Sequence, residues 1–329
     1  MVENRNITVV TVATIPGSMV PERSLLPDVL PTDRLQVGGK PKPPLRDDLR
    51  RIPDVRNAIT VLSCWAQAIG IAAGAVWVGN PLVWVAALFL MGRSIVMFNI
   101  LGHEAAHRLL FRNRRLNDFV GRWLLAYPAF QAFDLYRRSH FAHHRDELGP
   151  DEPDVGLYAG YPITKASLRR KLARDAFGVS GFKIMRQLLG ALDSHGGRPV
   201  VLRILAVQGA LIAACILAGH PWLYFVLWLV PYLTVWRVLN RLRAIAEHAG
   251  MERSDDRRGT THHVRQSWPA RFWMVPYHAG WHLAHHVDMA VPWRNLPRLH
   301  DELEAAGWVT PELTYPSYMA LWKALASRA

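Results

Sequence analysis

Histidines gather in three short stretches of this chain, "GHEAAHR", "RRSHFAHHRDE" and "GWHLAHHVD". They are His103 and His107, then His140, His143 and His144, and then His282, His285 and His286. Offsets of four, or of three and four together, place side chains on one face of a helix about one turn apart. Since imidazole is a ligand for iron, zinc, copper and nickel, the spacing predicts that each stretch supplies metal ligands.

The number of histidines bears on which metal they would bind. Eight of the fifteen histidines lie in these stretches, and His248 in "RLRAIAEHAG" is a ninth candidate. One zinc ion takes about four ligands, so this set is too large for one ion and suits two. A hydrolytic site would more usually include carboxylate ligands. Two redox-active ions with almost entirely nitrogen ligands instead point to the activation of dioxygen.

The elements that must position these histidines are predicted to be membrane helices. Half of the residues are hydrophobic, and they occur in long runs separated by arginine-rich segments. Four runs have about the twenty residues that a helix needs to cross a bilayer, at residues 57–79, 81–101, 200–219 and 221–239. Breaks at "GNP" and "GHP" join them into two hairpins. We therefore expect an all-α integral membrane protein with four transmembrane helices.

The charge pattern predicts the orientation of these helices. The net charge is +13, and the two hairpin turns contain no lysine or arginine. The positive-inside rule places both termini and residues 102–199 in the cytoplasm, so the three stretches can meet in one cytoplasmic helical cap with a di-metal site. Membrane topology explains the charge, and no nucleic-acid-binding motif is present. We expect a leader at residues 1–56, a membrane-embedded catalytic domain at 57–303 and a tail at 304–329.

With these motifs in place, the chain resembles the membrane fatty acid desaturase superfamily, whose signature is HxxxH, HxxHH and HxxHH on the cytoplasmic side of four spans. "HEAAH", "HFAHH" and "HLAHH" match it in order, and the resemblance covers about residues 57–303. It implies a non-haem centre of two iron ions, with O2 as co-substrate and electrons from a separate ferredoxin, cytochrome or flavoprotein reductase. The implied ligands are His103, His107, His140, His143, His144, His248, His282, His285 and His286.

The chain departs from this family pattern near the ninth and the third-box histidines. Some members have a water-bearing asparagine four residues before the ninth histidine, where this chain has Ala244. His278 lies four residues before His282, and we expect it to support the ligands rather than to be one. Outside the boxes, His262 and His263 are expected to be polar loop residues, and the remaining histidines, His195, His220 and His300, to be structural or solvated.

The sequence therefore predicts an oxygen-dependent di-iron oxidase that introduces a double bond into a long-chain fatty acyl lipid. A lipid hydroxylase or a carotenoid ketolase with the same boxes is one alternative. A zinc or nickel carrier is another, although a carrier needs polar ligands at the membrane midplane and these apolar runs offer almost none. The abundance of arginine and the short leader favour a bacterial inner membrane.

Overall fold

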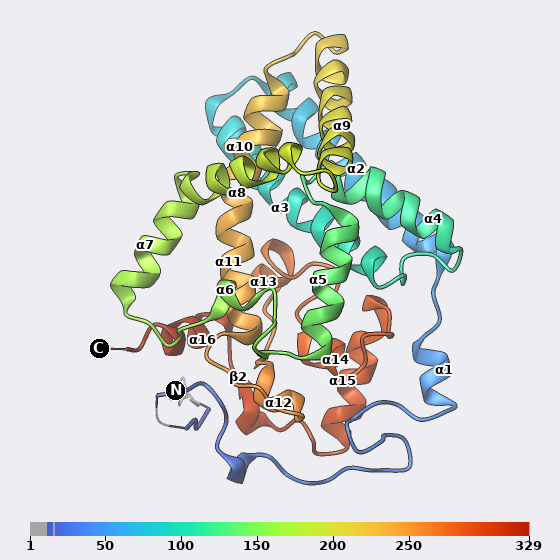
Figure 1. Ribbon diagram of the computed structural model, residues 1–329, viewed down its shortest axis with the longest axis vertical. Helices are drawn as coiled ribbons and strands as arrows, with labels where there is room; N and C mark the ends of the chain where they lie inside the picture. Colours follow the sequence, from blue (N-terminus) through green and yellow to red (C-terminus); the bar gives the residue numbers. More distant parts are fainter. Residues whose placement is uncertain (1–11, 16, 329) are drawn as a thin grey trace, which may run out of the picture.

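The chain is mostly helical in its computed structural model, which describes residues 12–15 and 17–328 (Figure 1). Its α-helices are α1 (Leu45–Leu49), α2 (Asp54–Val78), α3 (Pro81–Ala106), α4 (Arg114–Phe119), α5 (Phe133–Arg145), α6 (Val155–Tyr158), α7 (Lys165–Ala176), α8 (Val179–Gly190), α9 (Arg198–Leu217), α10 (Val230–Leu233), α11 (Val235–His248), α12 (Arg257–Thr260), α13 (Trp268–Trp273), α14 (His282–Val287), α15 (Leu296–Ala305) and α16 (Tyr318–Leu325). Two π-helical segments, η2 (Val120–Ala126) and η4 (Phe225–Leu229), and four short 3-10 turns complete the helices: η1 (Arg23–Leu25), η3 (Ala191–Asp193), η5 (Trp293–Asn295) and η6 (Pro311–Leu313). Strands β1 (His263–Val264) and β2 (Thr314–Tyr315) form one short parallel pair.

Three helices are long and apolar enough to cross a membrane: α2 together with the preceding α1, then α3 and α9. They gather at one end of the molecule, and α14, which carries the third histidine stretch, lies toward the other (Figure 1). Large apolar side chains on them are exposed, including Trp77, Leu82 and Leu217, which are 79–89% exposed. Such surface suits contact with lipid, so three of the four predicted spans are present as single helices.

The fourth apolar stretch, residues 221–239, does not form one helix. It is divided into η4, α10 and the start of α11, with a break at Thr234, whose backbone angles are φ −123° and ψ −83°. Pro231 lacks the amide hydrogen that a continuous helix needs there, and the π-helical turns lie just before it. A fourth crossing of the membrane therefore stays a prediction.

Helix α3 occupies the centre of the fold, where it packs against α2, η2, α10 and α11. Asn80 caps its start by accepting a hydrogen bond from the Leu82 amide, at 2.8 Å. More than half of its residues are buried, and the helix continues past its apolar segment to Ala106. It thus carries His103 beyond the apolar run, and His107 is the residue that caps its C-terminal end.

The N-terminal segment packs against the third histidine stretch. Arg50 makes hydrogen bonds of 2.8–3.1 Å with Asp288, and Arg34 pairs with Glu302 at 2.6 Å. Leu35 and Leu49 share an apolar core with α14 and α15. These contacts hold the N-terminal segment against α14 and α15.

Gly181 allows α8 to pack directly on the break after α10. A β-carbon at this position would lie 2.7 Å from the Leu233 α-carbon and closer still to its carbonyl oxygen. Because backbone atoms cannot move aside cheaply, we expect Gly181→Ala to lower the unfolding free energy by about 1–3 kcal/mol, measured by thermal unfolding in detergent. Gly190→Ala, in the same helix with open space around it, should be neutral or stabilising. Equal stability of the two variants would contradict this packing.

Candidate metal centre

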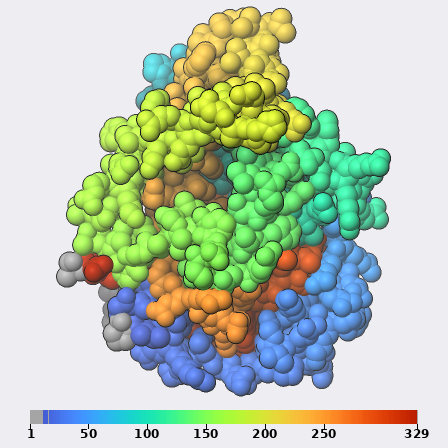
Figure 2. Space-filling model, in the orientation of Figure 1, coloured from blue at the N-terminus to red at the C-terminus, as the bar shows by residue number. Residues whose placement is uncertain are grey.

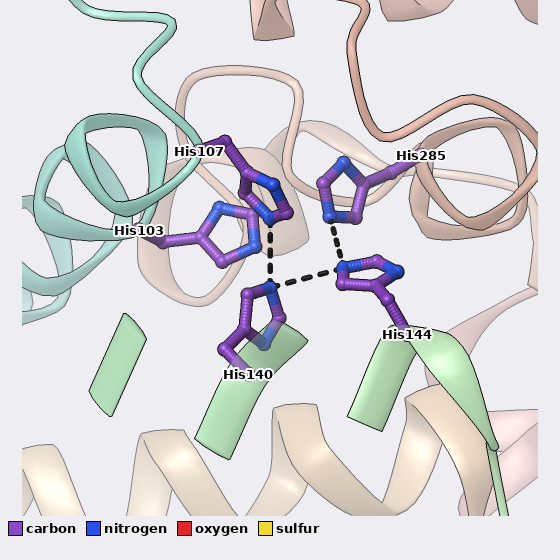
Figure 3. Close-up of side chains that lie close together, drawn as sticks. All are labelled: His103, His107, His140, His144 and His285. Atoms are coloured by element: carbon purple, nitrogen blue, oxygen red, sulfur yellow. Dashed lines mark hydrogen bonds between the residues drawn. The ribbon is translucent and has the colours of Figure 1, made fainter. Parts of the chain in front are cut away.

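Five histidines from three helices form the first cluster: His103, His107, His140, His144 and His285 (Figure 3). Helix α3 ends here, α5 supplies the middle pair and α14 supplies the last. The Nε2 atom of His140 lies 2.8 Å from that of His107 and 3.0 Å from that of His144. The Nε2 atoms of His144 and His285 are 3.1 Å apart. Ring nitrogens from segments over 140 residues apart therefore converge on one point.

Hydrogen bonds alone cannot satisfy this arrangement. A ring nitrogen either donates one hydrogen or accepts with one lone pair, yet Nε2 of His140 lies at hydrogen-bond distance from two other Nε2 atoms, and so does Nε2 of His144. A cation between the rings would let every Nε2 lone pair point inward at once. The donor set thus fits a metal ion bound by imidazole.

A second cluster lies beside the first and consists of His143, His248, His282 and His286. The Nε2 atom of His282 is 2.9 Å from that of His248 and 3.0 Å from that of His286, which repeats the pattern of one nitrogen with two ring partners. His143, His248 and His286 have ligand atoms close enough to share an ion. The rings of His144 and His286 stack with centroids 4.3 Å apart, so the two clusters are adjacent.

Two histidine stretches with the same spacing contribute to the clusters in opposite ways. In α5 the outer pair, His140 and His144, belongs to the first cluster and His143 to the second. In α14 the outer pair belongs to the second cluster and His285 to the first. Residues four apart are about 40° apart around a helix, whereas adjacent residues are about 100° apart, so each helix can face both clusters.

Carboxylates and a carbonyl hold the outward Nδ1 atoms of the second cluster. Glu152 accepts from His143 at 2.5 Å, Glu147 accepts from His286, and the Thr260 carbonyl accepts from His248 at 2.9 Å. Hydrogens placed on Nδ1 leave the Nε2 lone pairs free for a metal, as in many metal sites where such partners fix the ligand ring.

These supporting carboxylates were missed by the sequence analysis. Glu147 is three residues beyond His144, and Glu152 lies in the "DEPD" segment next to the second box. Glu147 is buried and also accepts hydrogen bonds from Arg257, at 2.6 Å, and from Thr260. Acidic residues just after a histidine box were the available signal, but only the fold shows which of them turn back toward the rings.

Burial keeps most of these imidazoles neutral. It lowers the pKa of His140, His144, His248 and His285 well below the usual value, and neighbouring rings add to the effect. For His143 burial acts in the same direction, but the hydrogen bond and charge of Glu152 outweigh it and raise the pKa. Neutral imidazole is the form that binds metal.

A cavity of about 180 Å³ lies against both clusters. His103, His140, His143, His248, His282 and His285 line it, together with side chains of α3, α6 and α11. Figure 2 shows this face of the molecule hollowed between α5 with α6 and α7 with α8, and part of α11 is visible inside. Ala244 lines the cavity, and its methyl group cannot orient a water molecule.

His278 lies outside both clusters. It precedes α14 with a φ of 58°, its side chain is exposed, and its ring neighbour is Trp293, at a centroid distance of 5.9 Å. His278 does not share a helix with His282, because α14 begins only at His282. Its left-handed backbone conformation belongs to the turn that leads into that helix.

His262 and His263 are buried, contrary to the expectation of polar loop residues. His262 donates to the Ala249 carbonyl at 2.9 Å, and burial lowers its pKa to about 4. His263 stacks on His300 with ring centroids 4.5 Å apart, beside the β1–β2 pair. Both histidines therefore help to pack the C-terminal part of the cap.

The low pKa of His262 predicts a loss of stability in acid. Between about pH 6.5 and pH 4 the unfolded chain binds a proton that the folded chain does not, so stability should fall as the pH is lowered through this range. In detergent, His262→Gln should show a smaller fall of the thermal midpoint between pH 7.5 and pH 5 than the parent. His195→Gln, at an exposed position, should behave as the parent, and an unchanged fall in His262→Gln would contradict the assignment.

Comparisons with known proteins agree with the histidine pattern. The model of the fatty acid desaturase family matches residues 79–318. Similar proteins include dihydrorhizobitoxine desaturase from Bradyrhizobium elkanii, 26% identical over 63% of each chain, and a chloroplastic omega-6 fatty acid desaturase from Glycine max, 25% identical over 79% of this chain and 65% of the relative. The sn-1 oleoyl-lipid 12-desaturase of Anabaena variabilis is 23% identical over 74% of this chain and 72% of its own. This chain spans less than two thirds of the length of the first two. The chain belongs to the fatty acid desaturase family.

Proposed function

We propose that this protein is an oxygen-dependent oxidoreductase that binds two iron ions and introduces a carbon–carbon double bond into an aliphatic segment of its substrate. His103, His107, His140, His144 and His285 would hold one ion, and His143, His248, His282 and His286 the other. The observation that carries the proposal is the convergence of Nε2 atoms into two adjacent, buried clusters. The bound irons would supply the oxidising power that an unactivated C–H bond requires.

The overall reaction needs a separate source of electrons. Two hydrogen atoms leave neighbouring carbons, and dioxygen takes them up together with two electrons and two protons, which gives two water molecules and the alkene. We propose an electron-donor protein of the ferredoxin, cytochrome or flavoprotein reductase class. We also propose that the cap lies on the cytoplasmic side of a bacterial inner membrane, where such donors are available.

The chain's own residues prepare the site for this chemistry. Glu147, Glu152 and the Thr260 carbonyl hold Nδ1 hydrogens on three rings and so orient their Nε2 atoms. Seven of the nine histidines are buried, which limits their contact with bulk water. The cavity beside His103 and His282 leaves room for a substrate carbon next to the metal positions.

Two kinds of substrate are named among the relatives, oleoyl-lipid and dihydrorhizobitoxine. The long-chain acyl lipid predicted from the sequence is the candidate that most of these names favour. It remains a proposal for this chain.

The first test is metal content together with product analysis. Detergent-purified protein produced with ample iron should contain about two irons per chain, and with dioxygen and a reduced donor it should form an unsaturated product. A hydroxylated product from the same protein would favour the hydroxylase alternative. Zinc alone, or no metal in folded protein, would overturn the di-iron proposal.

A further inference from the structure

The cavity beside the histidine clusters has an unusually polar wall for a site that would receive a hydrocarbon chain. Besides the histidines, seven polar or charged side chains line it: Asn99, Glu104, Gln131, Asp154, Asn240, Arg243 and Glu247. Three of these are carboxylates and one is a guanidinium. Ligand pockets are commonly apolar with a few polar groups that fix orientation, so this lining predicts a substrate that is itself polar and charged.

Several polar atoms on this wall make no hydrogen bond to the protein. Among the described residues, five buried atoms without a hydrogen bond belong to side chains that line the cavity: Gln131 Oε1, Glu247 Oε1, the Tyr277 hydroxyl, Trp293 Nε1 and His285 Nδ1. A buried polar group without a partner costs about 1–3 kcal/mol. These atoms are covered by the surrounding side chains, so a ligand bonds them only where those side chains turn toward the cavity.

Two of the charged side chains lie on one face of α11. Asn240, Arg243 and Glu247 are spaced by three and four residues, so they form a ladder on one side of the helix that ends beside His248. Nε of Arg243 is 3.6 Å from Oε1 of Glu247. Both signs of charge are thus available within one helical turn of a candidate metal ligand.

The opposite walls add polar groups at the same level. Asn99 lies one turn before His103 on α3, and Asp154 lies at the start of α6, next to Tyr158. The carbonyl of Asp154 accepts from the Leu157 amide at 2.9 Å, whereas its carboxylate has no hydrogen-bond partner among the described residues. The cavity is also small, at about 180 Å³. Sites for drug-sized ligands measure about 300–1,000 Å³.

We propose that this cavity binds a small zwitterionic substrate of the amino-acid class, with an ammonium group, a carboxylate and a short aliphatic segment. Arg243 would bind the carboxylate, and Asp154 and Glu247 would bind the ammonium group. The aliphatic carbons would then lie against the histidine clusters. This inference rests on the proposed desaturase chemistry and replaces the acyl lipid by a polar molecule with at least two adjacent saturated carbons.

The test measures binding to the full-length, iron-loaded protein in detergent by isothermal titration calorimetry. The probes are norleucine, which has both charged groups, hexanoic acid, which lacks the amine, and pentylamine, which lacks the carboxylate. Because a hydrogen bond to a charged group contributes about 1.5–3 kcal/mol, norleucine should bind at least about tenfold more tightly than either analogue.

Two variants assign the charged ends separately. Arg243→Gln should weaken norleucine and hexanoic acid about tenfold and leave pentylamine unchanged, whereas Asp154→Asn should weaken norleucine and pentylamine and leave hexanoic acid unchanged. The probe that each variant still binds shows that its cavity is folded. Asp151→Asn, a matched change of an exposed acid in the same segment, should leave all three affinities as in the parent.

The outcomes separate this inference from the proposed function. If norleucine binds no more tightly than its two analogues, or if the variants leave its affinity unchanged, the zwitterion proposal is overturned, even where oleoyl-lipid in vesicles is desaturated. If the expected affinities are found and no alkene forms from norleucine, its longer homologues or oleoyl-lipid in vesicles, the binding proposal stands and the desaturase proposal fails.

Discussion

His140→Ala should remove the iron of the first cluster and reduce product formation by more than about a hundredfold. The Nε2 atom of His140 has two ring partners in that cluster, at 2.8 and 3.0 Å, so its loss opens the ligand set at its centre. Removing residues that merely support a ligand typically costs 10–100-fold, and loss of the ligand itself should cost more. Iron analysis should give about one iron per chain where the parent has about two.

The control for this variant is an exposed histidine. His195→Ala removes an imidazole that lies outside both clusters, and it should keep the parent's iron content and rate. Circular dichroism would show that both variants are folded. Full activity and two irons in His140→Ala would mean that the first cluster does not hold a metal that the reaction uses.

Glu147→Gln should weaken metal binding in the second cluster by about 10–100-fold. Glu147 accepts from His286 and from Arg257 and is buried. A neutral amide can present its NH2 group to His286 and reverse the ring tautomer, and it leaves the Arg257 charge without its partner. The measurement is the rate at which a chelator removes iron, which should rise for one of the two ions.

The neighbouring Asp146 provides a matched change of charge. It pairs with Arg253 at 2.6 Å on the surface, where the two side chains are 36% and 64% exposed. Surface pairs of this kind contribute about 0–1 kcal/mol, so Asp146→Asn should release iron at the parent's rate. The same release rate in Glu147→Gln and Asp146→Asn would show that the buried carboxylate does not support the metal.

The histidine boxes could be recognised from the sequence, but their division between two clusters could not. A spacing of three and four residues states that His140, His143 and His144 lie near one another on a helix. It does not state on which side of α5 each cluster lies, because this depends on how α5 and α14 face each other. The division of each histidine box between the two clusters therefore depends on how α5 and α14 pack against each other.

The sequence predicted three of the four apolar runs as single helices correctly, and the fourth differs for a physical reason. Helices α2, α3 and α9 follow the predicted runs closely because hydrophobicity and length determine them. The last run has the same composition but contains Pro231, and its chain turns at Thr234. Hydropathy does not detect such a break, since the residues on both sides remain apolar.

Supporting residues were hidden because their role depends on loop geometry. Glu147 and Glu152 lie in irregular chain after α5, and their carboxylates turn back to His286 and His143. Likewise, nothing in "GTTHHVRQ" distinguishes a buried His262 from a solvated one before β1 is paired with β2. Residue spacing predicts the faces of helices, and Glu147, Glu152 and His262 lie outside the helices.

The distribution of the ligands along the chain also sets an order of events during biosynthesis. The first cluster joins His103 and His107 of α3 to His285 of α14, so it is incomplete until α14 has left the ribosome. By then α2, α3 and α9 have already emerged and can be in the bilayer. The complete first cluster therefore forms only after α2, α3 and α9, which are long and apolar enough to cross a membrane, have been synthesised.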